Sequence, residues 1–455
     1  MKAFHLDFNY VSRSLETVKG LLEQAAGLGY DTILWELEDQ VQWSACPQIA
    51  HSGSWSRETF REILDYAKRL GLEAVPLLQT MGHSEYMLKH FPAFREQPEF
   101  TDCWCTSNEE GIAFQMNVMM EYLEVFGPVR FFHLGCDEAY RFGSCPRCAP
   151  KGKARLFQEH IQRLAASLAS AGIRPCIWSD ICLDCPEILD ALPKDVLIWD
   201  WDYMCNADNP FPHAQVLASK GHSLVLCSSI KCWPDNMFVP NAGMHLPNVL
   251  AMMKAAPASF CVTNWSIRLN PIALSAPVME LPLCLDKMKG QSIDDVMRAL
   301  SIKFFNVEDG LEAMALAGSP FPELDAFSGT QWTRLKDSSM PPAGYLESLI
   351  DTPQKRTTIA AKAEEALAAI EKGSTIFRRS PTHLAECWLE GCNLRRDFTK
   401  LIIACLKGAD NARNADLDAF AERCERYFSL EETPASARKN ARLVMAPFVD
   451  FLAGP

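Results

Sequence analysis

Residues 131–138 read Phe-Phe-His-Leu-Gly-Cys-Asp-Glu, a short apolar strand followed by two adjacent carboxylates. Burying Asp137 and Glu138 side by side within a strand would carry a large desolvation cost. We therefore expect the strand to end near Gly135 and the pair to lie in water or in a site that uses it. In a barrel of parallel strands, such sites lie at the carboxyl ends of the strands.

Strand-like and helix-like segments alternate around this stretch, from the N-terminus to about residue 290. The predicted strands are Ala3–Phe8, Thr32–Leu37, Glu73–Leu78, Arg130–Leu134, Arg174–Trp178, Val196–Trp201, Ser223–Cys227 and Phe260–Trp265. The predicted helices between them are Leu15–Ala26, Arg57–Leu70, Glu109–Phe126, Ala154–Ser170, a short crossover near Glu187–Leu192, Ala214–Lys220 and Leu246–Ala256. This alternation indicates an α/β fold with a parallel sheet. Its length favours a (β/α)8 TIM barrel over an open doubly wound sheet.

Local signals support these boundaries. Four glycines stand between a predicted helix and the next strand, where a left-handed residue is wanted: Gly29, Gly71, Gly172 and Gly221. Ser107 and Glu110 have the spacing of a capping box before the helix at 109–126. Since no G-x-G-x-x-G or Walker-type loop follows a predicted strand, nucleotide binding is disfavoured.

The strand signal ends near residue 290. Four helices are predicted beyond it, at Thr357–Lys372, His383–Gly408, Asp416–Tyr427 and Ala435–Phe451, after a Pro- and Ser-containing stretch at 319–343. We expect a catalytic barrel at 1–290 and a C-terminal helical domain at 291–455. Nothing in the helical part points to chemistry.

Composition excludes several classes of protein. A net charge of −13 argues against a nucleic-acid or anionic-membrane partner, which would need a basic face. The N-terminus has no signal-peptide pattern and no apolar run is long enough to span a membrane, so a cytoplasmic protein is expected. The 18 cysteines are expected to be reduced thiols, buried or bound to metal. The oligomeric state stays open.

Polar and aromatic residues gather at the predicted strand ends. Besides Asp137 and Glu138, the candidates for binding a substrate are Asp7, Glu38, His83, Trp178, Trp199, Asp200, Trp265 and Arg268. A lone Trp is more often core packing, but three beside carboxylates at one end of a barrel suit a sugar. Sugars offer an apolar face for stacking and hydroxyls for carboxylates, in keeping with a mostly apolar pocket with a few placed polar groups.

The segment His133–Glu138 resembles the H-x-G-x-D-E signature of glycoside hydrolase family 20, the β-N-acetylhexosaminidases. Further blocks at Pro76–His83, Trp178–Asp180 and Val196–Asp200 fit the same family in order and spacing. Together they look most like the hexosaminidase D branch, in which the barrel opens the chain. The resemblance covers residues 1–290.

This resemblance implies an exo-acting enzyme that removes terminal β-linked GlcNAc or GalNAc from a glycan with retention of configuration. The substrate's own acetamido carbonyl would attack the anomeric carbon and form an oxazoline-type intermediate. Glu138 would protonate the leaving oxygen and then activate water, and Asp137 would orient the acetamide. No cofactor is implied for this chemistry. A neighbouring carboxylate is expected to raise the pKa of Glu138.

Two histidines stand near the pair. We interpret His133 as a hydrogen-bonded scaffold residue and His83 as a residue that supports the acid/base site. The chain also departs from the family pattern. Many members carry an Arg at the first strand that binds sugar hydroxyls. The basic residue noted near this strand is Lys2, which lies at its opposite end. Glu38, Asp39 or Arg268 would then bind the sugar hydroxyls in place of that Arg. The region at 228–233 lacks the Tyr that many members use to polarise the acetamide.

Cys145-Pro-Arg-Cys148 resembles half of a structural zinc site, which needs four ligands. The second half is either Cys103 with Cys105 or Cys182 with Cys185. We favour Cys103 and Cys105, because their loop should border the active site. Unrelated free thiols are the alternative, and a redox role is disfavoured because no helix N-terminus is predicted there to lower a thiol pKa.

Two other functions compete with the hydrolase. One is a barrel that binds sugar without turnover, which the missing Tyr keeps open and the retained Asp137 and Glu138 oppose. The other is a barrel enzyme of different chemistry, such as a metal-dependent lyase or isomerase. That enzyme would need His and carboxylate ligands at several strand ends, where this chain carries Trp.

Overall fold

The computed structural model describes residues 1–233, 235–287, 290–319, 351–408 and 416–453. The chain forms two compact units that interleave in sequence. The first comprises Met1–Asn9, Val18–Ser228 and Lys254–Thr263, and the second Tyr10–Thr17, Ser229–Met253 and Asn264–Pro455. The expected domain boundary at residue 290 stays a prediction.

Eight parallel strands close into a barrel in sequence order, which confirms the predicted fold class. They are β1 (Lys2–Asp7), β2 (Thr32–Glu36), β3 (Glu73–Leu77), β4 (Phe131–His133), β5 (Arg174–Trp178), β6 (Leu197–Trp201), β7 (Leu224–Lys231) and β8 (Phe260–Asn264). The register of β1 and β2 runs from Ala3 opposite Thr32 to Asp7 opposite Glu36. On its other side, β1 pairs with β8 from Lys2 opposite Phe260.

Seven strands begin and end within one residue of their predicted bounds, but β7 does not. It was predicted to end at Cys227 and instead continues to Lys231. Ser228, Ser229 and Lys231 therefore belong to the strand and not to the loop after it. The strands are apolar along most of their length and buried on both faces, as parallel strands covered by helices are.

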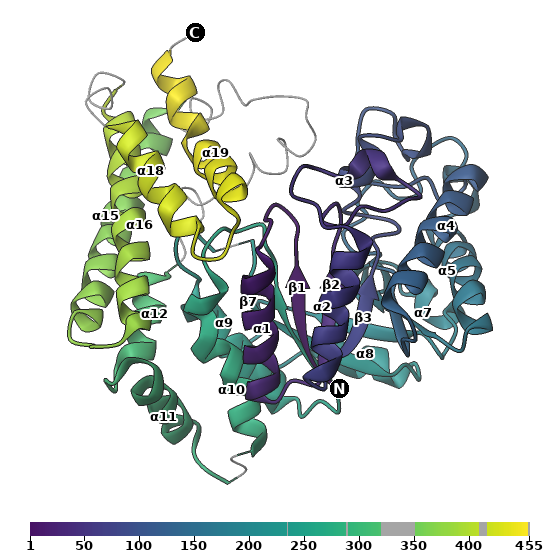
Figure 1. Ribbon diagram of the computed structural model, residues 1–455, viewed down its shortest axis with the longest axis horizontal. Coiled ribbons are helices and arrows are strands. Elements are labelled where there is room, and N and C mark those ends of the chain that lie inside the picture. The colour runs from purple at the N-terminus through teal and green to yellow at the C-terminus, as the bar shows by residue number, and fades with distance from the viewer. Residues whose placement is uncertain (234, 288–289, 320–350, 409–415, 454–455) are drawn as a thin grey trace. The chain divides into compact units, whose positions relative to one another are not determined.

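Helices cover the outside of this barrel, as α2 and α4 do beside β3 (Figure 1). The helices that precede β8 in the chain are α1 (Leu15–Leu28), α2 (Arg57–Arg69), α3 (Glu85–Leu88), α4 (Glu109–Phe126), α5 (Lys153–Ser170), α6 (Asp180–Asp184), α7 (Glu187–Ala191), α8 (Pro212–Ser219) and α9 (Ala242–Lys254). In α2, a repeat of three and four residues places Phe60, Ile63, Leu64 and Ala67 on the buried face.

The helix ends follow local chemistry. The four predicted helix-terminating glycines all have positive φ, for example 108° at Gly29 and 71° at Gly172. The predicted capping box at Ser107 is wrong, because Asn108 caps α4 by accepting a hydrogen bond from Gly111 N at 3.1 Å. Ser107 Oγ instead lies 3.2 Å from Cys148 Sγ.

The remaining helices belong largely to the second unit. They are α10 (Ala276–Lys287), α11 (Ile293–Phe305), α12 (Gly310–Ala317), α15 (Pro353–Phe377), α16 (His383–Leu406), α18 (Leu417–Phe428) and α19 (Pro434–Ala453). The long helices α15 and α16 run side by side (Figure 1). The four helices predicted beyond residue 350 are confirmed, and residues 320–343 of the predicted linker lie outside the described residues.

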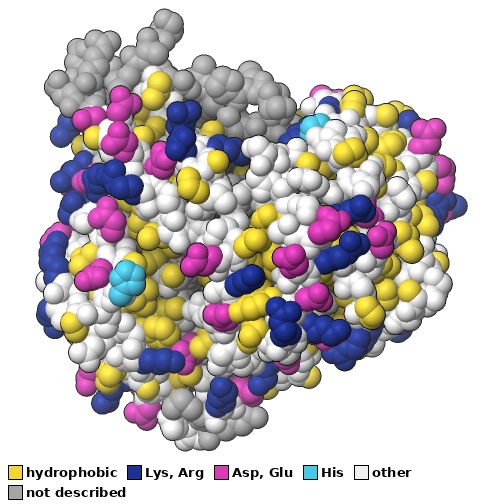
Figure 2. All heavy atoms as spheres, viewed as in Figure 1, with side chains coloured by type: hydrophobic (Ala, Val, Ile, Leu, Met, Phe, Trp, Pro, Cys, Tyr) yellow, Lys and Arg dark blue, Asp and Glu magenta, His cyan; other side chains and the backbone are white. Residues whose placement is uncertain are grey.

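On the face shown in Figure 2, Lys and Arg side chains of the described residues are interspersed with Asp and Glu. This mixture suits the acidic net charge and offers no continuous basic patch on that face. Among the described residues, no helix combines the length and apolar character that a membrane span requires.

Candidate active site

The chain leaves the barrel at His133, where β4 ends. The next residues turn sharply, with φ of 66° at Gly135, 76° at Cys136 and 45° at Glu138. A Cβ on Gly135 would clash with the side-chain amide of Gln79, so only glycine fits there. The strand ends before the carboxylate pair, as predicted. Left-handed residues other than glycine are typical of functional sites.

Asp137 and Glu138 share one imidazole. His83 Nε2 lies 3.5 Å from Asp137 Oδ2 and 3.1 Å from Glu138 Oε2. The side chain of Asp137 is 6% exposed and that of Glu138 35%, so only Glu138 presents a substantial surface to solvent. The backbone N–H of Glu138 donates to Asp180 Oδ2 at 2.7 Å, which fixes the turn against the start of α6.

The pKa values of the two carboxyl groups differ, and both are affected by His83. Burial raises the pKa of Asp137 to about 8, although His83 opposes this shift. Burial also raises the pKa of Glu138, but the hydrogen bond and charge of His83 outweigh it, and the net pKa lies below the usual value. Burial lowers the pKa of His83, but the two carboxylates dominate and hold it well above its usual value.

This pattern corrects the expectation that Glu138 has a raised pKa. The raised group is Asp137, because it is the more deeply buried and lies near Asp180 and Glu36. Glu138 keeps contact with water and receives the closer contact from His83. The free site therefore favours a protonated His83 beside an ionised Glu138.

Several buried polar groups lie near the pair. Glu36 accepts from Gln79 Nε2 at 3.0 Å and lies 3.0 Å from His5 Nε2. His133 is fully buried, and its Nδ1 accepts from Gly135 N at 3.1 Å. Its ring packs against Trp178 at a centroid distance of 4.4 Å. His133 is therefore a scaffold histidine, as predicted.

Two of the three predicted sugar-binding tryptophans are core residues. Trp178 and Trp199 are 0% exposed and pack edge to face, with ring centroids 6.0 Å apart. Neither ring offers a face to a sugar, and this burial argues against their predicted stacking role. Trp201 is partly exposed, and its Nε1 donates to Asp180 Oδ1 at 3.4 Å.

Trp201 contacts Asp180, which binds the Glu138 backbone, and it was not among the residues predicted to bind substrate. It shares a strand face with Trp199, because residues two apart point to the same side. Trp201 is the last residue of β6. The sequence could have indicated it for this reason, because active sites of barrels lie at the carboxyl ends of the strands.

The other carboxylate candidates in this unit are also buried at strand ends. Asp7 is 1% exposed and accepts from Asn9 N at 2.6 Å, and Glu38 is 2% exposed with a φ of 44°. Asp200 lies beside Ser179, and burial raises the pKa of Asp200 to about 6. Their predicted contacts with substrate stay predictions.

Two candidates fall in the second unit. The N–H of Trp265 donates to Lys231 O at 3.0 Å, and the guanidinium of Arg268 donates to the carbonyl of Trp233. Arg268 is 4% exposed. Their predicted role in sugar binding stays a prediction.

Arg13 is a basic residue closer to the carboxyl end of β1 than Lys2. It is 1% exposed, donates from Nη2 to Ser266 Oγ at 3.2 Å, and lies 4.0 Å from Glu431. The sequence analysis named only Lys2 near this strand and did not consider Arg13, which follows the last residue of β1 by six positions.

Three of the four cysteines predicted as zinc ligands lie together, and their role as ligands stays a prediction. Cys105, Cys145 and Cys148 gather with Glu96, and their ligand atoms lie within 4.8 Å of one another. Cys103 is outside this group, with its thiol directed to Trp104 O at 3.7 Å. Glu96 had not been predicted, because its contact with the thiols is formed only in the folded chain.

Comparison with known proteins agrees with the fold and the motif. The profile described as "Glycosyl hydrolase family 20, catalytic domain" matches residues 19–257, more than half of the chain. Human hexosaminidase D is 25% identical over 335 residues, covering 66% of this chain and 68% of that protein. Bovine hexosaminidase D is 28% identical over 222 residues, covering 46% of this chain. That match spans 64% of the bovine protein, less than two thirds of its length.

Solved structures share the fold at low sequence identity. The chitobiase of Flavobacterium johnsoniae aligns with a TM-score of 0.54 and 17% identity, over 97% of this chain and 78% of that one. The exo-β-N-acetylglucosaminidase of Vibrio harveyi aligns with a TM-score of 0.52 and 16% identity, over 69% of this chain and 58% of its own. The predicted resemblance is confirmed, and the chain belongs to glycosyl hydrolase family 20.

Proposed function

We propose that the chain is an exo-acting β-N-acetylhexosaminidase that removes terminal β-linked GlcNAc or GalNAc with retention of configuration. The observation that carries the proposal is the adjacent Asp137–Glu138 pair at the end of β4, with His83 within 3.5 Å of both carboxylates. Two carboxyl groups on consecutive residues suit a reaction in which the substrate supplies the nucleophile and the protein supplies only acid/base and orienting groups.

Glu138 is the proposed general acid and base. Its carboxylate is the more exposed of the two and so can reach a glycosidic oxygen. In the first step Glu138 donates a proton to the leaving oxygen while the acetamido carbonyl attacks the anomeric carbon. In the second step Glu138 takes a proton from the water that opens the oxazoline-type ring.

Asp137 is the proposed partner of the acetamide. Its Oδ1 atom is buried and has no hydrogen-bond partner among the described residues. A buried acceptor in this state is costly unless it is used. Accepting the acetamide N–H would orient the carbonyl for attack. In its ionised form, which the raised pKa of about 8 disfavours in the free site and the developing charge favours, Asp137 would also stabilise the positive charge on the ring nitrogen.

His83 is the proposed proton reservoir. In the free site the proton rests on His83, since the carboxylates raise the His83 pKa and His83 lowers that of Glu138. Transfer along the 3.1 Å contact from His83 to Glu138 would supply the proton that the leaving oxygen receives. Asp180 and Trp201 would hold the turn that carries Glu138.

A chromogenic assay tests the proposal. The wild type should release para-nitrophenol from the β-GlcNAc or β-GalNAc glycoside, and Glu138→Gln should lose about 10²–10⁴-fold in kcat/KM, the usual contribution of a general acid. Glu110→Gln, an exposed carboxylate on α4, is the matched control and should keep full activity. No release from either glycoside would contradict the proposal and favour a barrel that binds sugar without turnover.

A further inference from the structure

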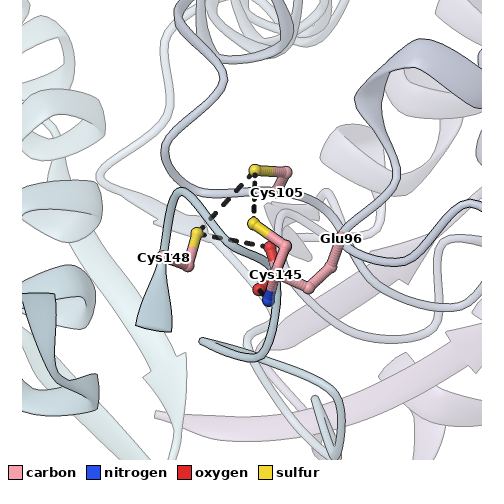
Figure 3. Close-up of side chains that lie close together, drawn as sticks. All are labelled: Glu96, Cys105, Cys145 and Cys148. Carbon is pink, nitrogen blue, oxygen red and sulfur yellow. Dashed lines mark hydrogen bonds between the residues drawn. The ribbon is translucent and has the colours of Figure 1, made fainter. Parts of the chain in front are cut away.

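Three thiols and a carboxylate converge in the first unit, outside the acid/base pair. Figure 3 shows Cys105, Cys145, Cys148 and Glu96 turned toward one another. Cys105 Sγ lies 3.6 Å from Cys145 Sγ and 3.7 Å from Cys148 Sγ, and Cys148 Sγ lies 3.3 Å from Glu96 Oε2. All four residues are buried.

We propose that these four residues hold a structural zinc ion. Zinc prefers four tetrahedral ligands of this kind, with sulfur at about 2.3 Å and carboxylate oxygen at about 2.1 Å. Ligands at those distances are separated by about 3.8 Å between two sulfurs and about 3.6 Å between sulfur and oxygen. The two sulfur–sulfur distances of 3.6 and 3.7 Å are close to this edge length, and the sulfur–oxygen distance of 3.3 Å is somewhat shorter. A disulfide would need about 2.0 Å between sulfurs.

The charge balance also points to a cation. Glu96 is 2% exposed, and no Lys, Arg or His of the described residues is among the groups that act on its carboxylate. A buried carboxylate is expensive unless it is paired with a cation or bound to a metal. Its other oxygen, Oε1, accepts from Cys145 N at 2.8 Å and leaves Oε2 directed at the thiols. Outer hydrogen bonds of this kind orient metal ligands.

Backbone hydrogen bonds hold the segments that carry the proposed ligands. Cys148 N donates to Cys145 O at 3.0 Å, and Ala149 N donates to the same carbonyl at 2.9 Å, which directs both thiols to one side of a tight turn. Cys105 N donates to Phe94 O at 2.9 Å, so the segments that carry Cys105 and Glu96 are joined by backbone pairing.

The proposed ion would tie together two loops of the active site. Glu96 and Cys105 follow β3 on the loop that carries His83, whereas Cys145 and Cys148 follow β4 on the loop that carries Asp137 and Glu138. Trp104 N donates to Met81 O at 3.0 Å, and this bond passes the restraint on to the segment next to His83. The inference itself rests on the four ligands and not on the proposed hydrolase activity.

A second group, Cys232, Asp235 and His245, does not carry the same inference. Both ring nitrogens of His245 are engaged, Nδ1 with Ser229 Oγ at 2.9 Å and Nε2 with Asp235 Oδ1 at 2.8 Å. A metal there would have to displace a buried hydrogen bond that already satisfies the histidine.

Metal analysis of the full chain, purified without chelator, tests the inference. The wild type should contain stoichiometric zinc, and Cys145→Ser and Glu96→Gln should lose most of it. Cys103→Ser is the matched control, because Cys103 is buried and two residues from Cys105 but outside the ligand group. This variant should keep its zinc. Zinc far below stoichiometry in the wild type, or equal loss in Cys103→Ser, would overturn the proposal.

Cobalt replacement keeps the test decisive if a ligand variant fails to fold. Wild-type protein loaded with Co²⁺ should show a thiolate-to-cobalt charge-transfer band together with the strong d–d bands of a tetrahedral site. A spectrum of octahedral cobalt without the charge-transfer band would contradict ligation by three thiols. Neither measurement uses a glycoside, so failure of the metal site and failure of the hydrolase proposal are distinguishable.

Discussion

His83 Nε2 lies 3.1 Å from Glu138 Oε2, closer than its 3.5 Å distance to Asp137 Oδ2. This difference decides which carboxyl group is ionised in the free site. The nearer and more hydrated Glu138 has its pKa lowered by His83, against the effect of burial. The more buried Asp137 has its pKa raised by burial. The two carboxyl groups are adjacent in sequence, but their pKa values are shifted in opposite directions, upward for Asp137 and downward for Glu138.

Replacing His83 with Asn should move the pH profile of kcat/KM. The general acid must be protonated to act, and kcat/KM reports the pKa of the free enzyme. In the proposed mechanism the wild type holds this proton on His83, whose pKa lies well above its usual value, so the proton is lost only at high pH. Removing His83 leaves the proton on Glu138 alone, a carboxyl group whose ordinary pKa is 4.5 and which only burial raises. The alkaline limb should therefore move to lower pH, by about one unit or more, a typical size for side-chain pKa shifts.

The control for this experiment is His51→Asn. The side chains of His51 and His83 are 37% and 36% exposed, and His51 lies 3.8 Å from a carboxylate, Asp39. Its removal should leave the profile unchanged. An alkaline limb that stays in place in His83→Asn, or moves to higher pH, would show that His83 does not hold the catalytic proton.

Asp137 should make stability depend on pH. Its pKa is raised from an ordinary 3.8 to about 8 in the folded chain, so folding favours the protonated form. The stabilisation is present below about pH 4 and is lost as pH rises toward about 8. Across this range, thermal melts should show the wild type losing stability relative to Asp137→Asn. A constant difference between the two proteins would argue against the raised pKa.

Gly135→Ala should destabilise the protein more than an alanine at another glycine of similar φ. The φ of Gly135 is 66° and its new Cβ would meet the Gln79 side chain, whereas Gly172 has a φ of 71° and open space around it. Both variants carry backbone strain of about 1–3 kcal/mol, and only Gly135→Ala adds a clash. Denaturant unfolding measures the difference, and equal losses would show that Gln79 moves aside freely.

Substitutions of the two tryptophans of β6 should have different effects, with Trp199→Ala lowering stability and Trp201→Ala weakening substrate binding. Trp199→Ala empties a fully buried position and should cost about 3–5 kcal/mol of unfolding free energy. Trp201→Ala should cost less stability, because Trp201 is partly exposed, and should raise KM several-fold if its ring contacts the sugar. A Trp201→Ala variant with unchanged kinetics would remove Trp201 from the site.

Most strand bounds could be predicted because apolar runs and flanking glycines mark them locally. β7 was the exception, since Ser228, Ser229 and Lys231 look like loop residues. Folding satisfies them with distant partners: Ser229 N donates to Asn248 Oδ1 at 3.2 Å, and Lys231 Nζ donates to Asn270 O at 2.9 Å. Such tertiary bonds leave no mark in the local pattern.

The candidate active site could also be predicted only where the local sequence marks it. Asp137 and Glu138 could be predicted because they follow the end of an apolar strand, whereas the pKa order of the pair depends on an imidazole more than fifty positions earlier in the sequence. Glu96 could not be assigned beside the cysteines for the same reason. Trp178 and Trp199 were predicted at the barrel mouth because position along a strand does not reveal how deeply a ring is buried.

The most direct test of the proposed mechanism compares two para-nitrophenyl β-glycosides that differ only in the acetamido group, the N-acetylglucosaminide and the glucoside. If the substrate's own acetamide is the nucleophile, the wild type should hydrolyse the first and leave the second almost untouched. Comparable kcat/KM values for the two glycosides would contradict substrate-assisted catalysis through Asp137 and Glu138.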